Sequence, residues 1–450
     1  MTNDMTRGNP TRLIISFTLP VLFGNLCQQL YGMVDSIIVG RAISMEALAA
    51  VGATSGISFL VIGCIQGLTA GFSVITAQRF GAGDYEGVKR SVATSALLSL
   101  AATVLLTAAG ILTARPLLEV MNTPADIIED SYAYIIVIYY GVAATAFYNL
   151  LSCIIRALGD SKTPLIFLVF ASFLNVALDL LFIITFHMGV GGAAWATVLS
   201  QGVSGLLCLG YAWRRFPLLR MEKRHWTFDW SYAWKHLRLA LPMAMQFVIT
   251  GTSVLVNQAV LNLFGSAASK IHMLSEQVAV SFGTAMATYA GQNYGAGKAG
   301  RVQEGLRKCA LACEAITLGI MVIMTAFGGV MSSWFIDGYH PEVIQQAHLY
   351  LFISALFYPA LTMLFLYRNT LLGLGNGVTP MLAGVCELLS RMIGAPVLGH
   401  FFGFTGLCWI NPIAWVTASG LLFLSYRKTM RNIRPVDPTV DASDSNKIMN

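Results

Sequence analysis

The sequence predicts an all-α integral membrane protein with twelve transmembrane helices in two six-helix lobes, related by a pseudo-twofold axis. Two observations predict this fold. First, the 450 residues are 56% hydrophobic and only 11% charged, with a mean hydropathy of +0.67, whereas ordinary soluble domains carry roughly 25% charged residues. Second, short motifs of the first half return in the same order in the second half.

The repeat is clearest in the segment 78–83, Gln-Arg-Phe-Gly-Ala-Gly, which returns as Gln-Asn-Tyr-Gly-Ala-Gly at 292–297. Three further landmarks return at nearly the same offset: Leu-Pro (19–20 and 241–242), Leu-Gly with a later Thr-Pro (158–164 and 374–380) and Gly-x-x-Trp (192–195 and 406–409). Each copy holds an even number of spans, so both enter the membrane in one orientation. A duplicated helical membrane protein of this kind is usually a transporter whose pathway lies between its halves.

Each span is an apolar run of about 20 residues, the length a helix needs to cross a bilayer core of roughly 30 Å. We predict spans at 13–38, 47–77, 91–114, 131–155, 163–186, 191–213, 237–263, 268–290, 305–327, 347–370, 379–401 and 404–426. The second run is long for one straight crossing, which favours a tilted or interfacial stretch. The chain then divides into an N-terminal lobe, a cytoplasmic linker, a C-terminal lobe and a cytoplasmic tail: 1–213, 214–236, 237–426 and 427–450.

Charge predicts the orientation. If both termini are cytoplasmic and residues at the ends of spans are counted with the adjoining loops, the interior segments hold 24 of the 28 Lys and Arg residues, the outer loops hold three, and one, Arg391, lies well inside a span. This asymmetry follows the positive-inside rule and predicts a multi-pass protein of the cell membrane. The net charge of +6 therefore reflects the orientation of the chain in the membrane. It does not indicate a nucleic-acid surface, because the basic residues lie along one membrane face.

No enzyme chemistry can be assigned to the sequence. The eight cysteines fall within predicted spans without the spacing of a zinc site. The segment 295–298, Gly-Ala-Gly-Lys, resembles part of a phosphate-binding loop but lacks the required Gly and the Ser or Thr after the lysine. We therefore predict no enzyme activity, no cofactor and no metal site beyond a sodium ion.

Carboxylates inside spans are functional candidates, because each costs roughly 2.5–3.5 kcal/mol to insert. The sequence has five: Asp35, Asp179, Glu276, Glu314 and Glu387.

Asp35 and Asp179 are expected in the outer half of the first lobe, together with Asn175 and Thr197. Asn175 and Asp179 are four residues apart and so share a helix face. Carboxylate, amide and hydroxyl oxygens suit sodium, and two nearby carboxylates in low dielectric equally favour holding a proton. The alternative is that Asp35 lies at the water interface and Asp179 is a structural hydrogen-bonding group. Asp35 maps by the repeat onto the neutral Asn257, which argues against a purely structural role.

The second-lobe acids have structural alternatives. Glu387 and Arg391 have the i, i+4 order of an ion pair, and we prefer structural neutralisation for them. Glu314 follows a basic segment in which Arg307 or Lys308 could pair with it. Glu276 either faces the cleft, where it could attract a cationic substrate, or is hydrogen-bonded between helices.

These motifs resemble those of the multidrug and toxic compound extrusion (MATE) family, over essentially all of residues 10–426. The resemblance implies a twelve-helix, two-lobe bundle that exports organic cations and other amphipathic compounds against inward flow of protons or sodium. It also implies that Asp35, Asn175, Asp179 and Thr197 are the coupling site and that Pro20 is a hinge. Some members use an acid in the seventh or tenth helix, and the spans 237–263 and 347–370 contain none.

The sequence thus predicts a secondary active multidrug efflux antiporter that works by alternating access between its lobes and is functional as a monomer in the lipid bilayer. The coupling ion, a proton or sodium, and the identity of the small amphipathic or cationic substrates stay open. One alternative is a lipid-linked oligosaccharide flippase of a related transporter group, which predicts more basic residues in the cleft than Arg391. A membrane enzyme or receptor predicts a reactive cluster or a large extramembrane domain, and the sequence shows neither.

Overall fold

The computed structural model describes residues 4–261, 267–333 and 341–433, and their side chains except at 254–271, 332–333 and 341. All regular structure in these ranges is helical. The first lobe contains α1 (Pro10–Ala42), α2 (Met45–Gly81), α3 (Tyr85–Val120), α4 (Ile128–Tyr140), α5 (Val142–Ala157), α6 (Lys162–Asp179), the π-helical turn η1 (Leu180–Thr185) and α7 (Gly189–Arg215). The second contains α8 (Trp230–Leu261), α9 (Ala267–Gly295), α10 (Ala299–Ser333), α11 (Pro341–Leu356), α12 (Tyr358–Gly373), α13 (Val378–Cys408) and α14 (Ile410–Asn432).

Two helix pairs each form one bent crossing. α4 and α5 meet at 45°, and α11 and α12 meet at 52°, at equivalent places in the two lobes. With these pairs counted as single elements and η1 continuing α6, the described residues form six crossing elements per lobe. By length and apolar character alone, seven of the described helices could span a membrane, or nine with the bent pairs. The first-lobe bend needs the glycine at 141, because a Cβ there would lie 2.1 Å from a methyl group of Val198 on α7.

Several helix bounds differ from the predicted spans. α2 is one helix of 37 residues, so the long second run is not divided. α8 begins at Trp230, inside the stretch predicted as linker, and the 3₁₀ turns η2 (Pro217–Leu219) and η3 (Lys223–Trp226) precede it. These starts extend beyond the apolar runs because helix caps and first turns are polar.

The duplication is visible in the backbone. Three pairs of equivalent glycines adopt the left-handed conformation that only glycine adopts freely. Their φ values are 73° and 70° at Gly83 and Gly297, 88° at both Gly159 and Gly375, and 59° and 55° at Gly189 and Gly403. The first two pairs end helices, and Gly403 interrupts the helical backbone of α13. The same turns are therefore built twice.

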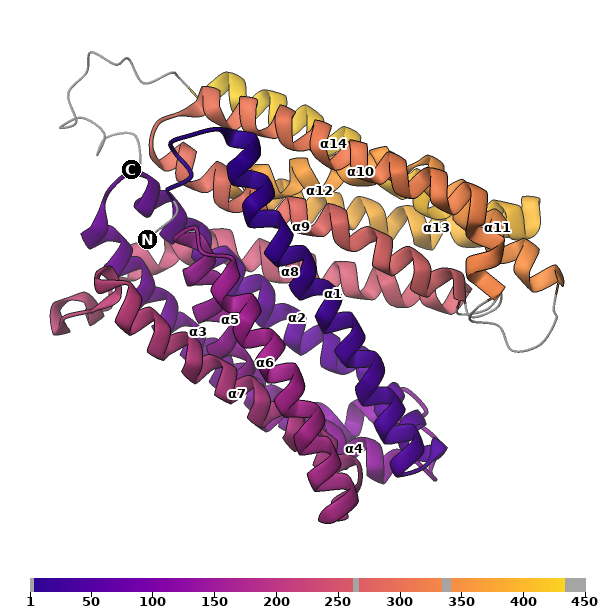
Figure 1. Cartoon of the computed structure of the whole chain (residues 1–450). Helices are drawn as coiled ribbons and strands as arrows, with labels where there is room; N and C mark the ends of the chain where they lie inside the picture. The colour runs from indigo at the N-terminus through magenta and orange to yellow at the C-terminus, as the bar shows by residue number, and fades with distance from the viewer. Residues whose placement is uncertain (1–3, 262–266, 334–340, 434–450) are drawn as a thin grey trace.

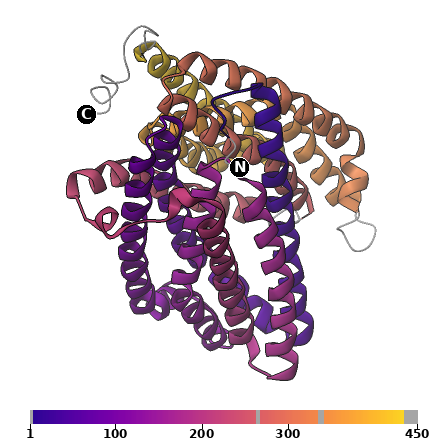
Figure 2. The same cartoon turned by 60° about the vertical axis from the view of Figure 1, so that its left-hand side comes forward.

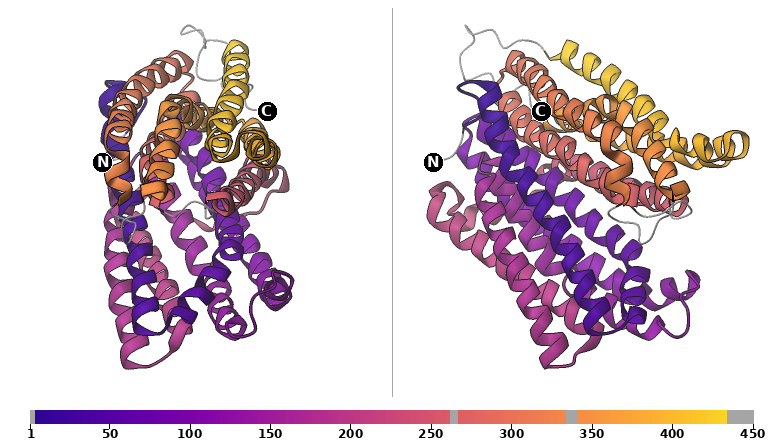
Figure 3. Two further views of the ribbon diagram at one scale, coloured as in Figure 1. Left: turned by 90° about the vertical axis from the view of Figure 1, so that its right-hand side faces the viewer. Right: turned by 45° about the vertical axis from the view of Figure 1, so that its right-hand side comes forward.

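The two lobes join at one end and diverge toward the other (Figures 1 and 3). The beginning of α1 and the end of α14 lie at the joined end, where the linker also lies (Figure 2). α2 and α8 approach closely there: a Cβ on Gly71 would lie 2.4 Å from the Cα of Ala240. Further along, a Cβ on Gly81 would lie 1.9 Å from the carbonyl oxygen of Gln292. The glycines thus permit backbone contact between the lobes.

The segment 4–9, which we call the N-terminal strap, crosses from α1 onto the second lobe. The side chain of Met5 is 1% exposed, and its backbone nitrogen donates to Oε1 of Gln292 at 2.8 Å. Lys298 donates to the carbonyl of Thr6, and Arg301 donates to the carbonyl of Gly8, each at 3.0 Å. The strap therefore reinforces the joined end of the lobes.

Candidate coupling and substrate sites

The four first-lobe residues singled out in the sequence lie on three neighbouring helices. Asp35 is on α1, Asn175 and Asp179 are on α6, and Thr197 is on α7. Asp179 is the last residue of α6 before the π-helical turn η1, a kind of irregularity that often lies at functional sites. We call these four residues the first-lobe oxygen cluster.

Hydrogen bonds join part of this cluster. Nδ2 of Asn175 donates to Oγ1 of Thr197 at 3.3 Å, and the hydroxyls of Thr197 and Tyr31 are 3.1 Å apart. The carboxyl groups of Asp35 and Asp179 are close enough to interact electrostatically. The structure thus brings all four predicted residues into one neighbourhood in the first lobe.

Several oxygens of the cluster lack an N–H or hydroxyl donor. Both carboxylate oxygens of Asp179, Oδ1 of Asp35 and Oδ1 of Asn175 are buried and receive no such hydrogen bond from the described residues, and the carboxyl groups of Asp35 and Asp179 instead face each other. Asp179 and Asn175 are only 0% and 1% exposed. Buried acceptors normally have a hydrogen-bond donor or an ion beside them. This arrangement can hold a sodium ion among oxygen ligands or take up a proton.

Two tyrosines complete the neighbourhood, and the sequence analysis missed both. Tyr31 and Tyr134 interact electrostatically with Asp35 and Asp179. Tyr31 precedes Asp35 by one helical turn, so its i, i+4 spacing could have revealed it. Tyr134 comes from α4, and no local spacing connects it to the others.

The second lobe holds a compact charge cluster instead, formed by Glu276, Arg368, Glu387 and Arg391. Arg368 and Glu387 form a buried ion pair, whereas the closest N–O distance from Arg391 to Glu387 is 3.8 Å. Arg391 also donates to Oδ1 of Asn411 at 3.0 Å. The expected Glu387–Arg391 ion pair is therefore confirmed, but Arg368, near the end of the predicted span 347–370, is the closer partner of Glu387.

Glu276 lies on α9 within electrostatic range of this cluster. It is absent from the residues that line the cavity between the lobes. Both readings of Glu276, a cleft acid and a group hydrogen-bonded between helices, stay predictions.

The predicted partner of Glu314 was wrong. Lys308 pairs with Glu304 at 2.6 Å, and in the described part of the chain Glu314 accepts a hydrogen bond from Thr317 at 3.4 Å and forms no ion pair. Pro20 lies inside α1, and its equivalent Pro242 lies inside α8. Each first helix of a lobe therefore lacks one backbone hydrogen bond at the same place. Asn257, the repeat equivalent of Asp35, lies among the side chains outside the description.

A cavity of about 270 Å³ lies between the lobes. Six helices line it, three from each lobe: α1, α2, α5, α8, α9 and α12. Its wall combines apolar side chains such as Val21, Met243 and Phe247 with amides such as Asn149 and Asn369. Apolar walls with a few placed polar groups are typical of small-molecule sites.

These observations agree with the comparison to known proteins. The MatE family matches residues 20–181 and 241–397, more than two thirds of the chain. The chain belongs to the MatE family. Relatives include "Probable multidrug resistance protein YpnP" of Bacillus subtilis (strain 168), 30% identical over 433 residues and 94% of each chain. The "Probable multidrug resistance protein NorM" of Thermotoga maritima is 27% identical over 435 residues and 92% of each chain.

The fold matches a solved MatE-type structure as well. "Crystal structure of MATE in complex with MaL6" superposes with a TM-score of 0.89 at 23% identity, over 96% of this chain and 99% of that one. Members of the MatE family are transporters rather than enzymes, and this chain is accordingly a multi-pass membrane transporter.

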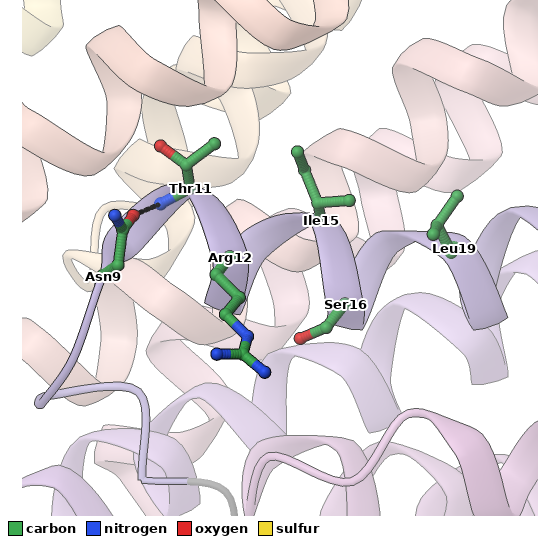
Figure 4. A pocket seen from close by; sticks show the side chains of 6 residues that line it. All are labelled: Asn9, Thr11, Arg12, Ile15, Ser16 and Leu19. Atoms are coloured by element: carbon green, nitrogen blue, oxygen red, sulfur yellow. Dashed lines mark hydrogen bonds between the residues drawn. The ribbon is translucent and has the colours of Figure 1, made fainter.

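The candidate coupling-site residues and a surface groove differ in whether the residues matched by the MatE family include them. The first matched stretch contains Asp35, Asn175 and Asp179, and Thr197 lies beyond its end. A larger surface groove of about 490 Å³ follows the first turns of α1, before the match begins (Figure 4). Only one helix contributes to this groove, and Asn9 caps that helix by accepting from the nitrogen of Thr11 at 2.9 Å. The groove is the surface of one helix, so the interlobe cavity is the better candidate for a substrate site.

Proposed function

We propose that this protein is a secondary active multidrug efflux antiporter. It exports amphipathic compounds, organic cations among them, in exchange for protons or sodium ions. The observation that carries the proposal is the set of buried oxygens at Asp35, Asn175 and Asp179 that lack an N–H or hydroxyl donor, with the two carboxyl groups facing each other. The MatE membership and the relatives named multidrug resistance proteins support the direction of transport and the breadth of substrates.

In the proposed cycle the lobes alternate between two arrangements. The present one is joined at the end that carries the termini, which the Lys and Arg distribution assigns to the cytoplasm. A proton or sodium ion enters the first-lobe oxygen cluster from outside and neutralises Asp35 or Asp179. The neutral cluster changes the packing of α1 against α6, and Pro20 provides a weak point at which α1 can bend. Substrate then leaves outward.

The membrane potential supplies about 2.3 kcal/mol per charge per 100 mV to such a cycle. Because one chain contains both lobes and the cavity between them, the proposed working unit is the monomer. The flippase alternative predicts several basic residues in the cleft, whereas Arg368 and Arg391 both face Glu387 and Arg156 is the one basic residue among the described residues that line the interlobe cavity.

The test is transport of ethidium, a fluorescent organic cation, in proteoliposomes with an imposed proton or sodium gradient. Wild type is compared with Asp35→Asn and Asp179→Asn, which keep the side-chain shape and remove the charge. We expect gradient-driven transport in the wild type and at least a tenfold loss in both variants. The gradient that drives transport identifies the ion.

Glu314→Gln is the matched control, because Glu314 is another acid of the spans but lies outside the cluster, on α10. It should keep gradient-driven transport. Transport that persists in the Asp35 and Asp179 variants would remove the coupling role from the first lobe. If neither gradient moves ethidium in the wild type, the antiport proposal fails for organic cations.

A further inference from the structure

The interlobe cavity has an uneven charge. Twenty described residues line it, and Arg156 is the one among them that carries a charge. Arg156 lies on the last turn of α5, next to Ala157, at the joined end of the lobes. The acids of the first-lobe oxygen cluster and of the second-lobe charge cluster are absent from this lining.

Arg156 has no carboxylate partner within the described structure. Its Nη2 donates to Sγ of Cys153 at 3.2 Å. The other groups that act on it electrostatically are Tyr148 and Cys208, both buried. By contrast, Arg368 pairs with Glu387 in the second lobe. The side chain is half-buried and lines the cavity, and a guanidinium in such a low-dielectric setting without a protein anion favours an anion that a ligand brings.

The surroundings of Arg156 suit a ligand that brings this counter-ion. Asn149 lines the same cavity about two turns earlier on α5, and Asn369 and Thr288 line it from the second lobe. Nδ2 of Asn149 and of Asn369 donates to the backbone of its own helix, which leaves one donor hydrogen on each amide. A planar guanidinium binds carboxylate and phosphate through two parallel hydrogen bonds. The apolar walls at Val21, Met243 and Phe247 then take the rest of the molecule.

We propose that the interlobe cavity selects amphipathic compounds that carry a carboxylate or phosphate group, and that Arg156 binds this group. The inference rests on the proposed function and narrows its substrates: organic anions are bound better than organic cations. Because the cavity is lined from both lobes, an anion held at Arg156 also contacts α8, α9 and α12 of the second lobe.

The test uses three probes in the same proteoliposomes: carboxyfluorescein as a free organic anion, ethidium as a cation, and a fluorescent phosphatidic acid as a lipid-borne phosphate. The variants are Arg156→Gln and Arg156→Lys. The control is Arg307→Gln, which removes an exposed arginine outside the cavity. Gel filtration checks that each variant is folded. We expect Arg156→Gln to lower the ratio of carboxyfluorescein to ethidium transport about ten- to a hundredfold, as for a lost hydrogen bond to a charged group. Arg156→Lys should be intermediate, and Arg307→Gln should leave the ratio unchanged.

The outcomes separate this inference from the proposed function. If the wild type moves ethidium in an Asp35-dependent way but not carboxyfluorescein, the anion inference is wrong and the antiporter stands. If carboxyfluorescein moves in an Arg156-dependent way and neither imposed gradient changes its rate, the inference stands and the coupling proposal fails. Arg156-dependent movement of phosphatidic acid alone supports the inference with a lipid as the source of the phosphate. If no probe moves, fluorescence anisotropy of carboxyfluorescein with purified protein decides, and binding that Arg156→Gln does not weaken overturns the inference.

Discussion

Gln78 and Gln292 hold equivalent positions in the two lobes, and each donates a hydrogen bond across the interface between them. Nε2 of Gln78 donates to the carbonyl of Gly373, and Nε2 of Gln292 donates to the carbonyl of Ala157, both at 2.8 Å. The two acceptors are themselves equivalent in the repeat. We call this reciprocal arrangement the glutamine clasp. Because it joins the lobes only at one end, it must break before that end can open.

Removing the clasp should favour opening of the joined end. Each hydrogen bond contributes roughly 0.5–1.5 kcal/mol, so Gln78→Ala or Gln292→Ala should raise the open population about two- to tenfold. Cys153 lines the interlobe cavity and reports this opening. The measurement is its labelling rate by an impermeant maleimide, in a background where the other seven cysteines are serine. The exposed Gln303→Ala is the control, and an equal rate in all variants would contradict the role of the clasp.

A methyl group at Gly81 should force the lobes apart. It would lie 1.9 Å from the carbonyl oxygen of Gln292, and backbone atoms cannot yield without moving a helix. We expect Gly81→Ala to destabilise the protein by about 1–3 kcal/mol, the usual range for overpacking. Gly210→Ala is the control, because nothing lies within 4 Å of a Cβ at that helical position. In thermal unfolding in detergent, the melting temperature should fall for Gly81→Ala and rise slightly for Gly210→Ala.

The N-terminal strap should contribute to stability through Met5. This side chain packs in a buried cluster with Ile14, Phe17 and Met286. Truncation to alanine leaves a cavity, so Met5→Ala should lower the free energy of unfolding by about 2 kcal/mol or more. Met45 is 69% exposed, and Met45→Ala should change it by less than about 0.5 kcal/mol. Equal unfolding of the two variants would show that the strap does not hold the lobes.

The buried pair of Arg368 and Glu387 should show strong coupling. Removing one partner leaves an uncompensated charge and costs about 3–5 kcal/mol. Arg368→Gln and Glu387→Gln should therefore each destabilise the protein strongly, and the double variant should be less destabilised than the sum. The exposed pair of Lys308 and Glu304 offers a comparison, and Glu304→Gln should cost about 0.5 kcal/mol or less. If the stability losses of Arg368→Gln and Glu387→Gln simply add in the double variant, the residue that neutralises Glu387 is Arg391 instead.

Local spacing accounts for what the sequence predicted well. Apolar run length gave the helical membrane fold, because every backbone group in lipid must be paired within its own helix. The i, i+4 spacing of Asn175 and Asp179 placed both on one face, and the motif spacing added Asp35 and Thr197. The structure brings these four residues together on α1, α6 and α7.

Features that depend on contacts between helices were not predicted. Tyr134 contributes to the first-lobe oxygen cluster from α4, which is distant in sequence. Arg368 on α12 pairs with Glu387 on α13. Arg156 follows the predicted span 131–155 directly and so falls in a predicted interior loop, although the structure places it on the cavity wall. A basic residue near the end of a helix can face the headgroups or the protein interior, and only packing decides between them.

The paired contacts at the joined end have the form of an isologous interface, in which one surface recognises a copy of itself. Gln78 contacts the second lobe as Gln292 contacts the first, and Gly81 and Gly295 lie in the same way against the backbones of Gln292 and Gln78. A single six-helix unit with this surface could pair with its own twin. Gene fusion then needs to supply only a connecting peptide, after which Asp35 and the second-lobe charges are free to diverge independently.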